Sequence, residues 1–272
     1  MIIGTAPIGL GINTGLAQPG ACVPGYVRAI SQRSEVTKVS DQSTLLDEQI
    51  AYYQARAREY DEWFFRQGRY DRGDELNRQW FSEVEQVRKA LDAFGPTGHV
   101  LELACGTGLW TEQLVRHAEQ LTAIDAVSEM LAINQVRVQS PKVRYLQANI
   151  FEWHPEEQYD VVFFGFWLSH VPQEQFEEFW KLVDAALKPA GRVFFVDSRY
   201  DVTSTAKDHH LEGSGATTVK RRLNDGREFR IVKIFYEAAK LAGRLSELQW
   251  RFEIEETDTY FIYGSGDKKI KV

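Results

Sequence analysis

A short glycine-rich turn is the first feature of this 272-residue sequence that suggests chemistry. It occupies residues 104–108, Ala-Cys-Gly-Thr-Gly, between a mostly apolar run and an amphipathic stretch. A strand that ends in a Gly-x-Gly turn before a helix lets a ligand approach the backbone closely, because glycine has no Cβ. Thr111 replaces the third glycine of a dinucleotide-binding fingerprint, which disfavours NAD or FAD as the ligand.

Two acidic residues accompany this turn. Glu102 lies just before it, where an acid would repel the pyrophosphate of a dinucleotide. Asp125 ends the next apolar run, about 20 residues after the turn, where an acid accepts hydrogen bonds from ribose hydroxyls. A nucleoside with a cationic group would satisfy both acids, and S-adenosylmethionine (SAM) is such a ligand.

An alternation of strand and helix patterns positions these residues. Apolar runs of strand length alternate with amphipathic runs of helical period, which is typical of a parallel sheet covered on both faces. The expected strands span residues 99–103, 120–125, 143–147, 159–165 and 192–196. The expected helices span residues 109–117, 128–138 and 172–187, and a turn at 188–191 precedes the fifth strand.

The chain before this alternation has two parts. Residues 1–43 are rich in Gly, Pro, Ser and Thr without periodicity, which predicts a poorly ordered extension. Helical periodicity over residues 45–65 and 74–94 predicts an N-terminal helical cap, residues 44–95.

The last third of the chain differs again. Asn224-Asp225-Gly226 is a strong hairpin-turn signal, so residues 214–235 are predicted to form an inserted β-hairpin. A helix over residues 236–245 and two strands, 250–255 and 259–263, follow. These strands are too close in sequence for a crossover helix and should pair antiparallel, which completes a Rossmann-like, seven-stranded, mostly parallel α/β sheet.

Five ordered motifs resemble those of class I SAM-dependent methyltransferases. They are Glu-Leu-Ala-Cys-Gly-Thr-Gly (102–108), Ile-Asp-Ala-Val-Ser-Glu-Met-Leu (124–131), Gln-Ala-Asn-Ile (147–150), Tyr-Asp-Val-Val-Phe (159–163) and Leu-Lys-Pro-Ala-Gly-Arg-Val-Phe-Phe-Val-Asp (187–197). The resemblance covers residues 44–272 and is strongest to the small-molecule branch that includes ubiquinone and menaquinone methyltransferases. It implies an enzyme that transfers the methyl group of SAM to a small-molecule acceptor by direct displacement.

The resemblance also implies a set of cofactor-binding positions. Gly106 and Gly108 would line the methionine side of SAM. Asp125 would hold the ribose hydroxyls, and Met130 would pack against the adenine, although ordinary helix packing also suits a methionine there. The other implied cofactor contacts are Tyr53, Tyr60, Glu102, Ala104, Ala126, Asn149, Ile150, Phe164 and Gly165. Ala104 departs from the family pattern, where a glycine is usual, as does Asn149, where an aspartate is usual.

The methyl acceptor should bind at the carboxyl ends of the fourth and fifth strands, where open α/β sheets bind ligands. A general base is needed only for an acceptor that loses a proton of high pKa, such as a hydroxyl. His170, after the fourth strand, is the expected base, with packing at the start of the next helix as the alternative. The residues expected to contact the acceptor are Trp167, Arg199, Tyr200 and His209. Basic residues in the hairpin favour an anionic acceptor, or else form a solvated face.

Composition and charge disfavour several other classes of protein. The formal net charge is −7, whereas nucleic-acid binders usually carry a basic excess. The two cysteines cannot form a disulfide framework, and no spaced ligand set predicts a metal site. No apolar run suits a membrane span, so we expect a cytoplasmic monomer or homodimer. The alternatives are a methyltransferase that acts on RNA or protein and a non-catalytic partner subunit.

Overall fold

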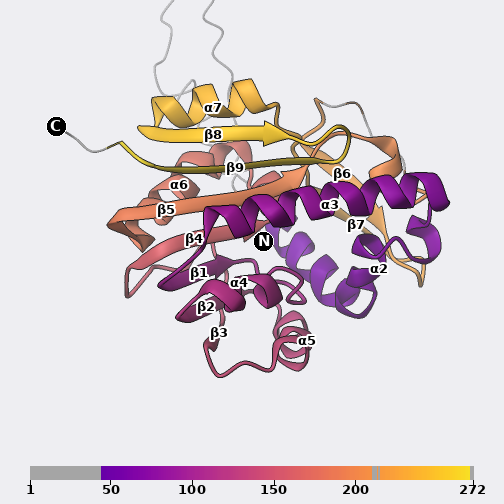
Figure 1. The fold of residues 1–272 in the computed structure, drawn as a ribbon. Helices are drawn as coiled ribbons and strands as arrows, with labels where there is room; N and C mark the ends of the chain where they lie inside the picture. The colour runs from indigo at the N-terminus through magenta and orange to yellow at the C-terminus, as the bar shows by residue number, and fades with distance from the viewer. Residues whose placement is uncertain (1–43, 210–212, 214, 270–272) are drawn as a thin grey trace, which may run out of the picture. The chain divides into compact units, whose positions relative to one another are not determined.

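A seven-stranded sheet forms the centre of the computed structural model, which describes residues 44–209, 213 and 215–269 (Figure 1). Its strands are β1 (His99–Leu103), β2 (Gln120–Asp125), β3 (Val143–Gln147), β4 (Tyr159–Gly165), β5 (Leu187–Ser198), β8 (Trp250–Glu256) and β9 (Phe261–Lys268). They lie in the order β3-β2-β1-β4-β5-β9-β8, and β9 runs antiparallel to both of its neighbours. The predicted mostly parallel sheet is therefore confirmed. The extension predicted for residues 1–43 lies outside the described residues.

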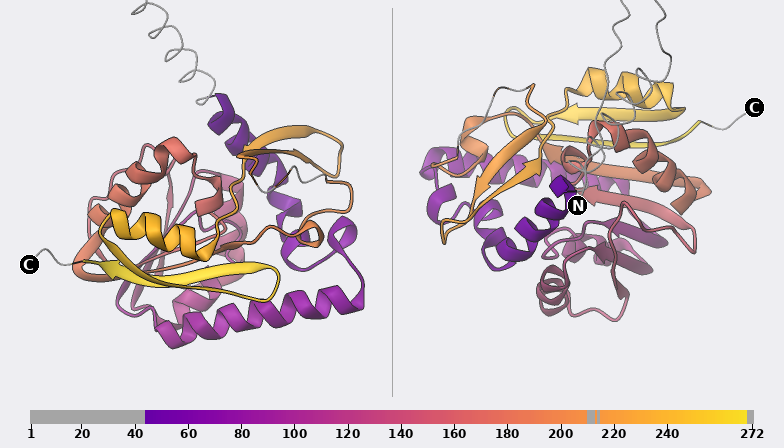
Figure 2. Two further views of the ribbon diagram at one scale, coloured as in Figure 1. Left: turned by 90° about the horizontal axis from the view of Figure 1, so that it is seen from above. Right: turned by 180° about the vertical axis from the view of Figure 1, so that it is seen from behind.

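Helices cover both faces of this sheet (Figure 2). One face carries α3 (Asp74–Phe94), α4 (Thr111–His117) and α5 (Ser128–Val138), and the other carries α6 (Phe176–Ala186) and α7 (Ala238–Glu247). Because successive strand residues point to opposite faces, each strand contributes alternate apolar residues to two separate cores. In β4, Phe163 packs into the core under α3 and α4, whereas Phe164 packs into the core under α6.

The first part of the predicted N-terminal helical cap, residues 44–64, meets the hairpin beside the sheet (Figure 2), whereas its second helix, α3, packs on a face of the sheet. Residues 44–56 are helical and are called the N-terminal helix; a 3₁₀ turn, Ala57–Glu59, and α2 (Tyr60–Phe64) continue it. The hairpin is a separate two-stranded antiparallel sheet of β6 (Thr218–Arg222) and β7 (Glu228–Val232), as predicted.

Contacts between the N-terminal helix and the hairpin hold the two together. The side-chain oxygen of Gln49 accepts the backbone N–H of Val232 at 3.0 Å. The ring of Tyr52 packs against Phe229 of β7, with the ring centroids 5.7 Å apart. These contacts join segments that are far apart in the sequence, and they enclose the space between the helix and the hairpin.

Several element boundaries differ from the predicted ones. β5 begins at Leu187 and not at residue 192 as predicted. Residues 188–191, predicted as a turn, form an irregular stretch of this strand, and the pairing register with β4 shifts across them. The helix predicted from residue 172 begins as a short 3₁₀ turn before α6. β9 extends to Lys268, since β5 and β8 continue to pair with it beyond residue 263.

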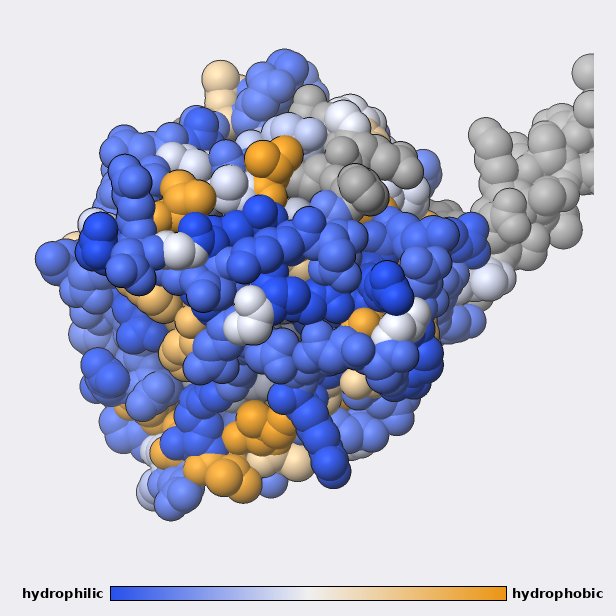
Figure 3. All heavy atoms as spheres, turned by 90° about the vertical axis from the view of Figure 1, so that its right-hand side faces the viewer, coloured by the Kyte–Doolittle hydropathy of each residue, from blue (hydrophilic) through white to orange (hydrophobic). Residues whose placement is uncertain are grey.

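The surface is mostly polar where Figure 3 shows it. The face seen from the right-hand side of Figure 1 is largely hydrophilic, with small separate apolar spots. Single exposed apolar side chains, such as Phe65 and Phe81, are ordinary on folded proteins. Among the helices that the structure describes, none has both the length and the apolar character needed to cross a bilayer.

Candidate functional site

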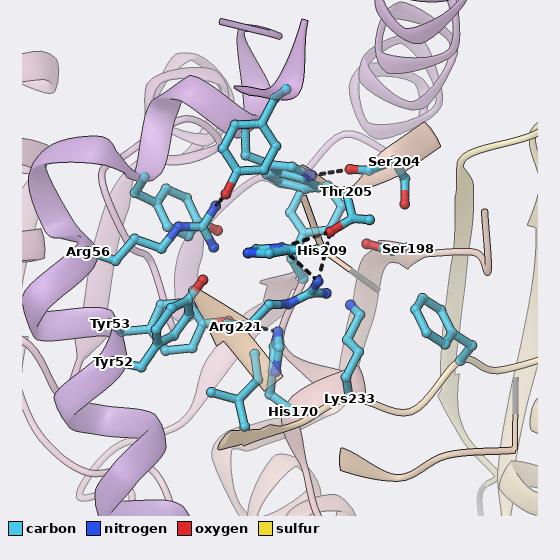
Figure 4. A pocket seen from close by; sticks show the side chains of 16 residues that line it. Tyr52, Tyr53, Arg56, His170, Ser198, Ser204, Thr205, His209, Arg221 and Lys233 are labelled. Atoms are coloured by element: carbon cyan, nitrogen blue, oxygen red, sulfur yellow. Dashed lines mark hydrogen bonds between the residues drawn. The ribbon is translucent and has the colours of Figure 1, made fainter. Parts of the chain in front are cut away.

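Two pockets adjoin each other at the carboxyl ends of the parallel strands. The glycine-turn pocket, of about 680 Å³, is bordered by the turn after β1 and by residues that follow β2, β3 and β4. The cationic pocket, of about 550 Å³, lies between the N-terminal helix, the end of β5 and the hairpin (Figure 4). The residues that line both pockets are Tyr53, Tyr60, Phe166 and His170.

The glycine turn has a left-handed backbone that its neighbours hold in place. Ala104 and Gly106 have φ of 53° and 52°, a region that glycine adopts freely and alanine adopts with strain. The backbone N–H of Cys105 donates to the carbonyl of Ile124, and that of Gly106 donates to the carboxylate of Asp125, both at 2.9 Å. These bonds tie the turn to the end of β2.

The two acids beside the turn have different surroundings. Glu102 is 2% exposed and accepts a hydrogen bond from the Thr111 hydroxyl at 2.6 Å. Burial raises the pKa of Glu102 to about 8, so the carboxyl is largely protonated at neutral pH. Asp125 lines the glycine-turn pocket, and burial raises its pKa to about 6, so it is mostly ionised at neutral pH.

Apolar side chains form another wall of the glycine-turn pocket. Ile50 belongs to the N-terminal helix, Val127 and Met130 lie at the start of α5, and Ile150 follows β3. Met130 is 1% exposed and packs with Val127, so it serves both the core and the pocket wall. This wall can accommodate a flat apolar group.

Most of the predicted cofactor contacts lie in the glycine-turn pocket. The structure places there Tyr53, Tyr60, Ala104, Gly106, Asp125, Ala126, Met130, Asn149, Ile150 and Gly165. Trp167, predicted to contact the acceptor, lines this pocket and not the cationic one. Its ring packs against Phe151 at 5.3 Å, which holds it on the side of the loop after β3.

Three of the predicted cofactor residues do not line the glycine-turn pocket. Successive residues of a strand point to opposite faces, so Phe164 of β4 lies in the core under α6 and its neighbour Gly165 lies at the pocket. Gly108 packs on α5, where an added Cβ would lie 2.6 Å from the side-chain oxygen of Asn134. Glu102 borders a smaller cavity that lies against the turn.

Three cationic side chains converge on the cationic pocket (Figure 4). Arg56 and Lys233 are buried, at 8% and 6% exposure, and Arg221 of β6 is partly buried. Lys233 donates to the Ser169 hydroxyl at 2.8 Å and lies 3.4 Å from the carboxylate of Asp197. Among the described residues that line this pocket there is no Asp or Glu.

The two arginines of this pocket have neutral partners. Arg56 donates to the Tyr70 hydroxyl at 3.2 Å, and its guanidinium lies 5.0 Å from the ring centroid of Tyr60. Arg221 donates to the Thr205 hydroxyl at 2.7 Å. Burial lowers the pKa of Arg221, and the nearby charge of Arg56 lowers it further. Sequestered positive charge without a counter-ion is costly, so this arrangement favours the binding of an anion.

Two neutral histidines border the cationic pocket. His209 lies there as predicted; burial lowers its pKa to about 4, and its Nε2 accepts the backbone N–H of Arg222 at 3.1 Å. His170 is 6% exposed, with Nδ1 2.6 Å from the carbonyl oxygen of Val232 and Nε2 2.9 Å from the hydroxyl of Tyr53. Burial, together with neighbouring positive charges, holds the pKa of His170 well below its usual range.

Two residues predicted to contact the acceptor, Arg199 and Tyr200, line neither of the two pockets. Arg199 donates to the backbone carbonyl of Asp258 at 2.9 Å and pairs with Glu256, so its long side chain ties the end of β5 to the connection between β8 and β9. Tyr200 is 38% exposed and packs on Phe235, which itself lines the pocket. Sequence position placed both residues near the site, but their side chains have other partners.

Sequence reasoning missed Arg56 and Lys233. A signal for Arg56 is present, because it lies one helical turn from both Tyr53 and Tyr60 and therefore shares their helix face. Arg221 was one of several basic residues in the hairpin, and its sequence position did not distinguish it from the exposed ones.

The chain is similar to proteins that are known by name. Residues 100–191 match the family described as methyltransferase domain. The chain is 30% identical to the ubiquinone biosynthesis O-methyltransferase of Klebsiella pneumoniae subsp. pneumoniae, over 53% of this chain and 58% of that protein. It is 31% identical to nodulation protein S of Rhizobium tropici, over 26% of this chain and 30% of that protein. It thus spans less than two thirds of the length of these curated relatives.

Solved structures match over more of the chain. The DhpI complex with S-adenosylhomocysteine (SAH) is 36% identical, with a TM-score of 0.69, over 84% of this chain and 98% of that chain. The DhpI–SAM–HEP complex gives the same identity and TM-score over 82% of this chain and 97% of that chain.

The glycine-turn pocket fits SAM as its ligand. The ionised carboxylate of Asp125 can accept ribose hydroxyls, and Met130 and Ile150 can pack against the purine. An added Cβ on Gly106 would meet no atom within 4 Å, so the turn leaves open space for a ligand to approach. Because 36% identity extends over 98% of a chain solved with SAH, in the same fold, this chain belongs to the SAM-dependent methyltransferases.

Proposed function

We propose that this protein transfers the methyl group of SAM to an oxygen of a small anionic acceptor bound in the cationic pocket. The observation that carries the proposal is the pair Arg56 and Arg221, which face one pocket without a carboxylate partner among the described residues. Residues that line both pockets make them neighbours, so a molecule in the cationic pocket would lie next to the cofactor.

The charge balance of the cationic pocket supports an anionic acceptor. Lys233 has Asp197 as a counter-ion, whereas Arg56 and Arg221 have hydroxyl and aromatic partners. An acceptor with one or two negative charges would supply the missing counter-charge and so stabilise the pocket. An uncharged acceptor would leave the charges of Arg56 and Arg221 without a counter-charge.

An acceptor that binds in its ionised form needs no general base. His170 and His209 are neutral, and both ring nitrogens of His170 already have partners. When bound, SAM supplies a methyl group on a positively charged sulfur, so an ionised oxygen can bond to the methyl carbon while the C–S electron pair returns to sulfur. The residues of the protein then have to bind the anion, align it and exclude water.

The similar proteins and the walls of the pocket support a small acceptor and an oxygen atom. The Klebsiella relative is named as an O-methyltransferase, and the DhpI–SAM–HEP complex holds a further component, HEP, together with SAM. The N-terminal helix and the hairpin enclose the cationic pocket and bury Arg56 and Lys233. An enclosed space of this kind suits a small molecule better than the exposed surface of an RNA or a protein.

Methyl transfer from isotopically labelled SAM to size-matched pairs of acceptors tests this function. Each pair combines a small carboxylate or phosphate monoester with an uncharged alcohol or amide of the same size. We expect labelled product from an anionic member alone, with the methyl group on oxygen as identified by mass spectrometry. Equal transfer to the uncharged members, or transfer to RNA or protein instead, would overturn the proposal.

Arginine variants separate the two pockets. Arg56→Gln and Arg221→Gln should weaken acceptor binding by about 10- to 100-fold, the range for a lost hydrogen bond to a charged group, and leave SAH affinity unchanged. Arg251→Gln is the matched control, because Arg251 is exposed on the outer strand β8 and pairs with Asp267. An equal loss in the control would point to general electrostatics and not to this pocket.

A further inference from the structure

We propose that His170 is a positioning residue: it directs the hydroxyl proton of Tyr53 away from the bound ligands, so that the Tyr53 oxygen acts as a hydrogen-bond acceptor where the two pockets meet. Such an oxygen favours SAM, which is positively charged at sulfur, over SAH, which is not. The inference rests on the proposed function, since it needs SAM in the glycine-turn pocket. Its test is a binding measurement and does not require a known methyl acceptor.

The tautomer of His170 follows from its partners. Nδ1 lies 2.6 Å from the carbonyl oxygen of Val232, and a carbonyl oxygen can only accept, so Nδ1 carries the proton. The ring is 6% exposed, and Lys233 lies close to it, so a second proton on Nε2 is disfavoured. Nε2 therefore presents a lone pair.

That lone pair fixes the direction of the Tyr53 hydroxyl. Nε2 lies 2.9 Å from the Tyr53 oxygen, and since it has no proton, the hydroxyl must donate to it. The lone pairs of the Tyr53 oxygen are then the part of the hydroxyl left for other partners. Gln49 supports this arrangement, because its side chain donates to the carbonyl of His170 at 3.3 Å and accepts the backbone N–H of Val232 at 3.0 Å.

The location of Tyr53 gives this polarity a consequence. Tyr53 lines both pockets, and the residues that the pockets share are aromatic side chains and a neutral histidine. The charged residues Arg56 and Arg221 line the cationic pocket but not the glycine-turn pocket. A positively polarised methyl group at this junction can make a C–H···O contact to an oxygen that only accepts. The neutral sulfur of SAH offers no such group.

Calorimetric titration of the full chain with SAM and, separately, with SAH tests the role of Tyr53. We expect Tyr53→Phe to weaken SAM binding two- to five-fold more than SAH binding, the range for a C–H···O contact. Tyr52→Phe is the matched control: it removes a hydroxyl from the adjacent residue, which lines the cationic pocket but not the glycine-turn pocket. The control should leave the ratio of the two dissociation constants as in the wild type.

A pair of His170 variants tests the positioning role itself. In His170→Gln, the side-chain oxygen can reach the place of Nε2 and accept from Tyr53, so the wild-type preference for SAM should be retained. In His170→Asn, the shorter amide can still donate to the carbonyl of Val232 but cannot reach Tyr53, so the preference should fall to that of Tyr53→Phe. A general packing role for His170 would change both dissociation constants together.

The outcomes distinguish the possible failures. Equal weakening of SAM binding and SAH binding by Tyr53→Phe would overturn the inference. An equal ratio of the SAM and SAH dissociation constants in His170→Gln and His170→Asn would also overturn it. If either His170 variant fails to fold, as judged by circular dichroism, the comparison of Tyr53→Phe with Tyr52→Phe still decides whether the Tyr53 hydroxyl distinguishes the ligands. Absence of SAM and SAH binding to the wild type would contradict the proposed function instead.

Discussion

The carboxylate of Asp125 accepts the backbone N–H of Gly106 at 2.9 Å, which joins the end of β2 to the turn after β1. Its other oxygen accepts the backbone N–H of Val127, also at 2.9 Å. Each carboxylate oxygen has a second lone pair, so the same group can shape the turn and still accept hydroxyl groups of a ligand. We therefore propose that Asp125 couples the conformation of the glycine turn to the binding of the cofactor.

Asp125→Asn should weaken SAH binding by about 10- to 100-fold, because the ribose hydroxyls lose a charged acceptor. The fold should persist, since the amide oxygen can still accept one of the two backbone N–H groups. Calorimetric titration with SAH measures the effect. Asp160→Asn is the control, because Asp160 accepts the N–H of His99 at 2.8 Å at the opposite end of the sheet. Unchanged SAH affinity in Asp125→Asn would place the ribose elsewhere.

The two glycines of the turn should respond differently to alanine. Both have a left-handed backbone, with φ of 52° at Gly106 and 92° at Gly108, so each substitution costs about 1–2 kcal/mol of strain. The Cβ at Gly106 meets open space, whereas the Cβ at Gly108 would overlap the buried side chain of Asn134. We expect Gly108→Ala to lose clearly more unfolding free energy, and Gly106→Ala to lose mainly SAH affinity.

Denaturant unfolding and calorimetry of the two glycine variants together check this expectation. Equal losses of stability would mean that Asn134 moves aside at little cost. Retained SAH affinity in Gly106→Ala would mean that the ligand does not approach the turn at that position.

Glu102→Gln should change how stability depends on pH. The folded-state pKa of Glu102, about 8, lies above its ordinary value of 4.5, so between these values the folded protein holds a proton that the unfolded chain has released. Its contribution is fully present below pH 4.5 and is lost as pH rises toward 8, by at most about 1.4 kcal/mol per pH unit. Glutamine removes this loss and can still accept the Thr111 hydroxyl.

The difference in melting temperature, Glu102→Gln minus wild type, should therefore increase from pH 5 to pH 8. Other groups titrate in this window, but they are common to both proteins and cancel in the difference. Melting curves in a series of buffers measure it. A difference that does not vary with pH would show that the carboxyl is ionised throughout.

The glycine-turn pocket could be predicted from the sequence because local signals mark its parts. Gly106 and Asp125 each follow an apolar strand, and parallel strands bring their carboxyl ends to one edge of the sheet. Phe164 was misplaced for a related reason. A strand buried on both faces shows no alternation, so the sequence does not say whether Phe164 or its neighbour Gly165 faces the pocket.

The cationic pocket could not be predicted in the same way. Its charges come from the N-terminal helix, β6 and the residue after β7, and only the packing of the cap against the hairpin brings Arg56, Arg221 and Lys233 together. Arg199 shows the opposite error. It follows a central strand, as a site residue should, but its side chain reaches the carbonyl of Asp258 instead.

The charge of Arg221 should destabilise the protein when no anion is bound. Burial and the nearby Arg56 both oppose that charge, as the lowered pKa of Arg221 indicates. Arg221→Gln should therefore melt at or above the wild-type temperature in phosphate-free buffer, even though the bond to Thr205 is weakened. Inorganic phosphate, added at constant ionic strength, should raise the melting temperature of the wild type, because a ligand that binds the folded state stabilises it.

Phosphate should raise the melting temperature of Arg221→Gln less than that of the wild type. It should raise the melting temperature of Arg251→Gln, which removes an exposed charge paired with Asp267, as much as that of the wild type. The control matters because phosphate also stabilises folded proteins without a specific site. Differential scanning fluorimetry over a phosphate series gives all three responses. If Arg221→Gln melts several degrees below the wild type in both buffers and gains as much from phosphate, Arg221 supports the fold through Thr205 and His209, and the anion binds elsewhere.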